Sequence, residues 1–215
     1  MRELLALSIA YLLGSVLPAD LLARAQGVDI RAVGTRNPGA TNALEQLGLV
    51  PGLIAGAYDV SVGLASMYVA ARLGLPTGWI YLAGLAAVVG HIFPVFFGFR
   101  GGQGMAAATG MLVYEMWVAL TRDQLSWVGI GMLGVLAVVV FVLSRSASVV
   151  GALVVPVLEL EVFLSGADWQ FVTFMTALAG IIWVVQLSIV RQNRLFHLAT
   201  PVREWVGKFR APTHG

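Results

Sequence analysis

The sequence predicts an all-α membrane protein with about seven transmembrane helices. Three observations support this fold class: the composition, the recurrence of long apolar runs and the distribution of basic residues. Hydrophobic residues make up 59% of the 215 residues and charged residues 11%, and the mean hydropathy is +0.87. Roughly a quarter of an ordinary soluble domain is charged, so this chain has too little charge to cover a water-facing surface. Because no stretch resembles a linker, we expect one integral membrane domain over residues 1–215.

The apolar runs have about the length that a helix needs to cross a bilayer. They lie at residues 4–23, 47–70, 79–98, 105–120, 127–143, 149–164 and 170–190. The fourth and sixth runs are short for complete crossings, and the sixth contains Glu159 and Glu161. The first run also fits a signal peptide with a weak cleavage site at residues 23–25, but the spans that follow it favour a retained helix.

The basic residues favour one orientation in the membrane. If the N-terminus lies outside, ten of the thirteen lysines and arginines fall in cytoplasmic loops and the C-terminal tail, and three fall outside. The cytoplasmic ten are Arg24, Arg31, Arg36, Arg100, Arg145, Arg191, Arg194, Arg203, Lys208 and Arg210, and the other three are Arg2, Arg72 and Arg122. This asymmetry predicts an outside N-terminus and a cytoplasmic C-terminus. It also explains the basic pI better than binding to nucleic acid does.

The longest predicted loop, residues 24–46, is cytoplasmic and contains a polar, glycine-rich stretch at residues 33–42. Gly34 and Gly39 permit close approach of the backbone, and Pro38 fixes a turn. Short polar side chains come from Thr35, Asn37, Thr41 and Asn42, and Arg36 adds a positive charge. A loop of this kind that opens into a helix at Leu44 can direct several N–H groups at an anion. It lacks the Gly-Lys-Ser/Thr ending of a nucleotide-binding loop, and a tight turn with an N-cap is an equally good interpretation.

A second glycine-rich segment follows the run at residues 79–98. His91 lies at the cytoplasmic end of that run, where an ionisable residue is costly and is therefore a functional candidate, although it equally fits a hydrogen-bonded structural histidine. Pro94 is expected to break the helix. A turn rich in N–H groups then follows, consisting of Arg100, Gly101, Gly102, Gln103 and Gly104. Two such loops on one face of the membrane predict a site for a phosphate or acyl phosphate head group, with apolar helices beneath it for a fatty chain.

The remaining polar residues give weaker signals. Asp20 and Asp59 are predicted near helix ends, as caps or as partners of loop arginines, and Glu115 is predicted to face the interior of the helix bundle. The chain has no cysteine, and its histidines and carboxylates form no pattern typical of a metal site. We therefore expect neither a metal ion nor another cofactor, and the oligomeric state stays open.

These motifs resemble the bacterial acyl-phosphate:glycerol-3-phosphate acyltransferase family. The resemblance runs through residues 10–15, 27–31, 37–42 and 47–48, and it continues with Gly90-His91-Ile92-Phe93-Pro94 and Gly101-Gly102-Gln103-Gly104. It implies a seven-span inner-membrane enzyme with a cytoplasmic site, which transfers an acyl group from acyl phosphate to glycerol 3-phosphate and makes lysophosphatidic acid for phospholipid synthesis. In that case the first loop binds phosphate through Asn37, Gly39, Thr41 and Asn42, and the second contributes His91 and the glycine turn. His91 is the candidate catalytic base for the proton of the acceptor hydroxyl group. The alternative is that the leaving phosphate takes this proton.

The chain departs from the family pattern at several charged positions. Thr35 replaces a serine, Arg36 a glycine, Glu45 an arginine, and Gln103 and Val62 each a lysine. The C-terminal motif is reduced to Asn193-Arg194-Leu195. Loss of a charge-assisted hydrogen bond to phosphate costs roughly 1.5–3 kcal/mol, which Arg36 would offset in part by bidentate contact.

Three functions fit these observations. The first is acyl transfer from acyl phosphate to glycerol 3-phosphate or another phosphorylated acceptor. The second is a non-catalytic membrane protein that binds lipid phosphate or a protein partner, which the missing cations favour. The third is a small transporter, which needs paired polar residues or broken helices at the centre of the membrane. Asp59 and Glu115 are too isolated in the sequence to predict such a site.

Overall fold

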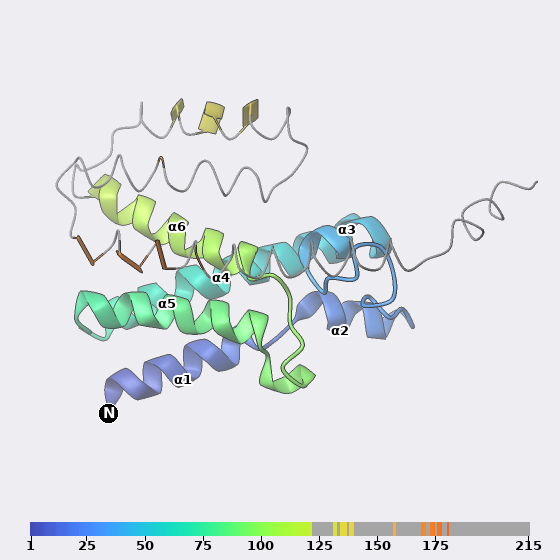
Figure 1. The fold of residues 1–215 in the computed structure, drawn as a ribbon, viewed down its shortest axis with the longest axis horizontal. Helices are drawn as coiled ribbons and strands as arrows, with labels where there is room; N and C mark the ends of the chain where they lie inside the picture. Colours follow the sequence, from blue (N-terminus) through green and yellow to red (C-terminus); the bar gives the residue numbers. More distant parts are fainter. Residues whose placement is uncertain are drawn as a thin grey trace, which may run out of the picture.

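The structure, a computed structural model, describes residues 1–121 and the helical residues 131–132, 134–136, 138–139, 157, 169–170, 173–174, 176–177 and 180. Every regular element in these described residues is a helix. The elements are α1 (Arg2–Gly14), α2 (Pro18–Ala25), α3 (Ala40–Leu47), α4 (Leu49–Arg72), α5 (Thr77–Ile92), the 3-10 helix η1 (Val95–Phe97) and α6 (Met105–Thr121). Helix α4 packs on α6, α5, α3 and α1, and α1 packs on α5 (Figure 1). The short helices α2 and α3 lie together at the end of this bundle opposite the N-terminus.

Three described segments are long and apolar enough to cross a membrane, namely Arg2–Ala25, Leu49–Arg72 and Thr77–Phe97, and Met105–Thr121 is a shorter apolar helix. These segments correspond to the first four predicted runs. Large apolar side chains such as Leu4, Leu5, Leu49 and Leu53 are exposed on them, as expected for helices that face lipid. The predicted runs at 127–143, 149–164 and 170–190 lie outside the described residues except at scattered positions. The count of seven spans and the orientation therefore stay predictions.

The first predicted run is not one helix. It divides into α1 and α2, with residues 15–17 between them in a non-helical connection. Pro18 is the first residue of α2, and the residue before it, Leu17, is extended at φ −114° and ψ 90°. Proline disfavours the helical conformation in the preceding residue, which explains the interruption in an otherwise apolar run.

The helix after the first polar loop begins earlier than the predicted start at Leu44. Gly39 is the extended N-cap residue, and α3 runs from Ala40 to Leu47. The polar residues of its first turn made this segment resemble loop in the sequence. The helix then ends at Gly48, which has φ 99° and separates α3 from α4. Gly48 is thus a point where a residue with a side chain would be strained.

Helices α4 and α6 approach until their backbones touch. A Cβ atom added at Gly63 would meet the carbonyl oxygen of Ala107, and one added at Gly110 would meet the carbonyl oxygen of Val60. Small residues at facing positions are typical of helix pairs in membranes, where close van der Waals contact drives association. The same type of contact holds α1 against α5.

The end of α1 is also attached to the turn that follows α5. The hydroxyl group of Tyr11 donates a hydrogen bond of 2.7 Å to the carbonyl oxygen of Phe93. The backbone N–H of Val95 donates to the hydroxyl oxygen of Ser15 over 3.4 Å. These bonds fix where the second glycine-rich loop begins.

Candidate active site

The first polar loop is organised around the buried side chain of Asn42, which is 1% exposed. Its amide nitrogen donates to the carbonyl oxygens of Ile30 (2.9 Å) and Val33 (3.2 Å), and its amide oxygen accepts from the N–H of Thr35 (3.0 Å). Asn42 therefore binds the loop to the first turn of α3. The resemblance implied that it contacts phosphate, but these three bonds occupy the side chain within the protein.

The other predicted residues of this loop lie around the N-terminus of α3. Thr35, Arg36 and Thr41 are exposed, Asn37 is half-buried, and Gly39 is buried. The first N–H groups of an α-helix have no partner within the helix, so those at the start of α3 are available to an anion. Arg36 lies in the left-handed region at φ 60°. This conformation explains why glycine suits that position in the related family.

The second loop folds back onto the end of α5. Helix α5 ends at Ile92, η1 follows, and the chain turns through Gly98 and Phe99 at positive φ. The N–H groups of Gly101 and Gly102 then donate to the carbonyl oxygens of Ile92 and His91, each over 3.0 Å. These two N–H groups therefore cap the end of α5, and the contribution of Gly101 and Gly102 to a phosphate site stays a prediction. Gly104, at φ 75°, leads directly into α6.

The two loops meet at Gly102. A Cβ atom added there would lie 2.5 Å from Nε2 of His91 and 3.4 Å from the side-chain oxygen of Asn37. Gly102 is buried, Gln103 is half-buried and Arg100 is exposed beside them. The structure thus brings Asn37 of the first loop together with His91 and Gly102, which come from a distant part of the sequence.

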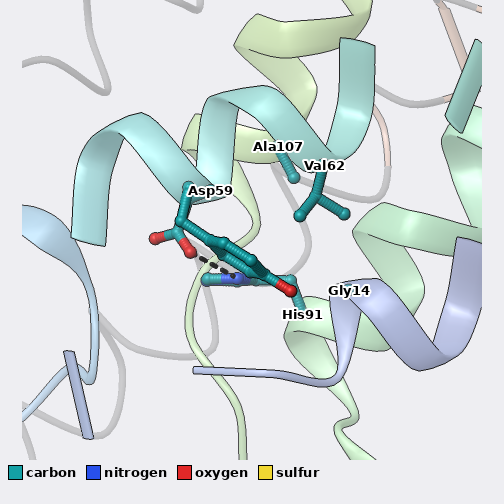
Figure 2. Close-up of a pocket in the computed structure, with 6 residues that line it drawn as sticks. Gly14, Asp59, Val62, His91 and Ala107 are labelled. Atoms are coloured by element: carbon teal, nitrogen blue, oxygen red, sulfur yellow. Dashed lines mark ion pairs between the residues drawn. The ribbon is translucent and has the colours of Figure 1, made fainter. Parts of the chain in front are cut away.

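His91 forms a buried pair with Asp59, a residue that the sequence predicts near a helix end (Figure 2). That placement is wrong, since Asp59 lies near the middle of α4 and is 2% exposed. Its Oδ1 atom is 3.6 Å from Nδ1 of His91, which is 4% exposed. The pocket around them is lined by Gly14, Tyr58, Val62 and Ala107, so helices α1, α4, α5 and α6 all contribute. An ionisable residue within an apolar run was the signal that could have placed Asp59 in this buried pocket.

Of the two roles predicted for Asp20, a helix cap or a partner of loop arginines, the structure shows pairing with arginines. Its carboxylate is 2.9 Å from Arg24 and 3.6 Å from Arg31, and it is buried. The guanidinium group of Arg24 also lies 5.4 Å from the centre of the Phe97 ring, a distance typical of a cation–π contact. These contacts join α2, the first loop and η1 beside the candidate site.

Other predicted residues lie farther from this junction or outside the described residues. Glu115 is buried in α6, as predicted. Glu45 is exposed on α3. Asn193 lies outside the residues that the structure describes.

Comparison with known proteins identifies the family. Residues 4–194 match the glycerol-3-phosphate acyltransferase family. The chain belongs to this family. Glycerol-3-phosphate acyltransferase 4 of Dehalococcoides mccartyi is 34% identical over 194 residues, which cover 89% of this chain and 99% of that protein. Glycerol-3-phosphate acyltransferase 1 of Deinococcus radiodurans is 46% identical over 112 residues, or 52% of this chain. That match spans 57% of the Deinococcus protein's length.

Solved acyltransferase structures share the fold over nearly the whole chain. The structure is similar to that of PlsY, an integral membrane glycerol 3-phosphate acyltransferase, in its glycerol 3-phosphate form, with a TM-score of 0.75 and 27% identity. The similarity covers 98% of this chain and 100% of that one. The lysophosphatidic acid form of PlsY gives a TM-score of 0.73 at 28% identity, with 92% and 93% of the two chains covered.

Proposed function

We propose that the protein transfers an acyl group from acyl phosphate to the 1-hydroxyl group of glycerol 3-phosphate and makes lysophosphatidic acid. The observation that carries this proposal is the junction of the two glycine-rich loops at Asn37, His91 and Gly102 in a chain that belongs to the acyltransferase family. Phospholipid synthesis would use the product.

The phosphate groups of the substrates would bind at the start of α3. Its free first-turn N–H groups provide donors, and its dipole favours an anion there. The side chains of Thr35, Asn37 and Thr41 would add hydrogen bonds, and Arg36 and Arg100 would add positive charge. Gly39 permits close approach of the substrate to the loop, and Gln103 and Gly104 would line the opposite side. Asn42 would act by holding the loop, and Asn193 remains a predicted contact from the C-terminal part.

The reaction needs no nucleophile from the protein. The substrate hydroxyl oxygen attacks the acyl carbonyl carbon, a carbon–oxygen bond forms, and the bond between that carbon and the phosphate oxygen breaks. The leaving phosphate takes the hydroxyl proton and departs as inorganic phosphate. Fixed N–H groups and guanidinium groups stabilise the charge that develops on the phosphate, which is an effective contribution to catalysis in a preorganised site.

The protein would lie in the bacterial inner membrane as one multi-pass domain, with its site facing the cytoplasm. The basic residues of the first two loops support this placement. Exposed Phe93, Phe96 and Phe99 beside Arg100 would contact lipid at the interface, next to the acyl chain of the donor.

Direct assay of the purified full-length protein in detergent tests the proposal. Acyl phosphate and labelled glycerol 3-phosphate are supplied, and labelled lysophosphatidic acid is measured against a Gly102→Leu variant, in which a side chain would collide with His91. We expect product from the wild type and none above background from the variant. Equal product from both proteins contradicts the proposal for this acceptor.

Glu45, Val62 and Gln103 favour a second candidate, a family member that binds acyl phosphate without turnover, because each replaces a cation of the family pattern. Saturable binding of acyl phosphate to the wild type, with no release of inorganic phosphate, would identify this function.

A further inference from the structure

The buried pair of Asp59 and His91 is not used by the chemistry described above. Asp59 comes from α4 and His91 from the last turn of α5, and both side chains are almost fully enclosed. A buried carboxylate is costly unless a hydrogen bond or an opposite charge compensates it. A buried pair of ionisable residues in an apolar bundle is therefore a candidate for a functional role.

The imidazole ring is the partner that the pocket offers to Asp59. Within the described part of the chain, Oδ1 of Asp59 has no hydrogen bond. The other residues that line the pocket are Gly14, Tyr58, Val62 and Ala107, and none of these four carries a positive charge. At 3.6 Å, Nδ1 of His91 is slightly beyond hydrogen-bond distance from that oxygen, so a small rotation of the ring would complete the bond.

The opposite edge of the same ring faces the glycine turn. Nε2 lies 2.5 Å, and Cδ2 3.1 Å, from where a Cβ atom of Gly102 would be. The carbonyl oxygen of His91 also accepts the N–H of Gly102. The ring thus lies between the middle of α4 and the point where the second loop meets Asn37.

We propose that Asp59 is a positioning residue that acts through His91. It holds Nδ1 of the ring, so that the Nε2 edge supports Gly102 and keeps the second loop aligned with Asn37. His91 is then also a positioning residue rather than the base, because its enclosed ring does not reach solvent. The expected effect on catalysis rests on the proposed acyl transfer. The pairing of Asp59 with His91 does not depend on it.

Steady-state kinetics test the catalytic consequence in the full-length protein. We expect Asp59→Asn and His91→Gln each to lower kcat for acyl transfer by about 10- to 100-fold, since displacement of a loop by about 1 Å has effects of this size. The double variant should lose no more than the poorer single variant, because both residues act through one contact. Ser66→Ala is the matched control. Ser66 is also a buried polar residue of α4, and its hydroxyl group has no hydrogen bond among the described residues. We expect this variant to retain kcat within about twofold. Multiplicative losses in the double variant would overturn the proposal.

Nitrogen-15 NMR of the histidine side chains tests the pairing without any activity. The chain has three histidines, and the His91 signals are those that disappear in His91→Gln. We expect a proton on Nδ1 in the wild type and altered His91 nitrogen shifts in Asp59→Asn. A wild-type His91 without a proton on Nδ1, or shifts identical in Asp59→Asn, would overturn the proposal. The wild-type spectrum alone is decisive if Asp59→Asn does not fold. If the wild type makes no lysophosphatidic acid but shows this NMR signature, the proposed function fails while the pairing stands.

Discussion

Single residues of the first loop divide into those that build it and those that are free to contact a substrate. Asn42 and Asn37 are five positions apart and chemically identical, yet Asn42 is buried with three hydrogen bonds and Asn37 is half-buried beside Gly102. The sequence motif contains both without distinguishing them. The difference in burial distinguishes Asn42, which builds the loop, from Asn37, which can contact a substrate.

Replacement of these two asparagines by alanine should therefore affect different properties, stability for Asn42 and catalysis for Asn37. Asn42→Ala leaves backbone groups of Ile30, Val33 and Thr35 without partners, and we expect it to lower the free energy of unfolding by about 3 kcal/mol. Asn37→Ala should change stability by less than about 0.5 kcal/mol, but should lower kcat/KM for glycerol 3-phosphate. Thermal unfolding in detergent and acyl-transfer kinetics measure the two effects. Equal stability of both variants would show that Asn42 does not build the loop.

Arg36 is strained by its backbone conformation. A residue with a side chain at φ 60° costs roughly 1 kcal/mol relative to glycine. We expect Arg36→Gly to raise the unfolding free energy by about that amount and to raise KM for glycerol 3-phosphate through the lost charge. Arg36→Lys is the control, since it keeps both the charge and the strain. A lower stability of Arg36→Gly would mean that side-chain contacts of Arg36 outweigh the strain.

At the scale of the elements, the contact between α4 and α6 depends on two glycines. A methyl group at Gly63 or Gly110 would collide with the backbone of the facing helix. We expect Gly63→Ala and Gly110→Ala each to destabilise the protein by about 1–3 kcal/mol, the usual cost of overpacking. Gly78→Ala in α5 is the matched control, because a methyl group there would meet no atom closer than 3.9 Å. Equal melting temperatures of all three variants would contradict this packing.

The apolar runs in the sequence predict the described long helices well, because run length and composition follow from the thickness of the bilayer. They do not predict the interruption at residues 15–17 or the separate helix α3. Those features depend on Pro18 and on the bonds of Asn42 to loop carbonyl groups that only the folded chain brings near. For the same reason the glycine motifs indicate which residues lie in the site but not that the Gly101 and Gly102 amides cap α5. Asp59 and His91 are 32 positions apart, so their pairing depends on how α4 packs against α5.

At the scale of the whole molecule, the charge asymmetry predicts that both glycine-rich loops face the cytoplasm. The chain contains no cysteine, so single cysteines can be introduced without a background signal. Gln46 and Thr77 are exposed at the start of neighbouring predicted crossings of opposite direction, which makes them a matched pair. We expect an impermeant thiol reagent to label Gln46→Cys in inverted membrane vesicles and Thr77→Cys in right-side-out vesicles. The reverse pattern would overturn the predicted orientation.

The backbone contact between α4 and α6 would also limit how the proposed acyl phosphate donor enters. Helices that touch through their main chains leave no tunnel between them for a hydrocarbon tail. For the proposed donor, a long acyl chain would therefore lie outside the contact between α4 and α6, along the apolar surface of the described helices, while its phosphate end reaches the loops. Because no closed cavity would then limit the length of the acyl chain, the protein would discriminate little between donors whose chains differ by a few carbons. The fatty acids incorporated would then reflect the cell's supply of donors more than any choice made by the protein.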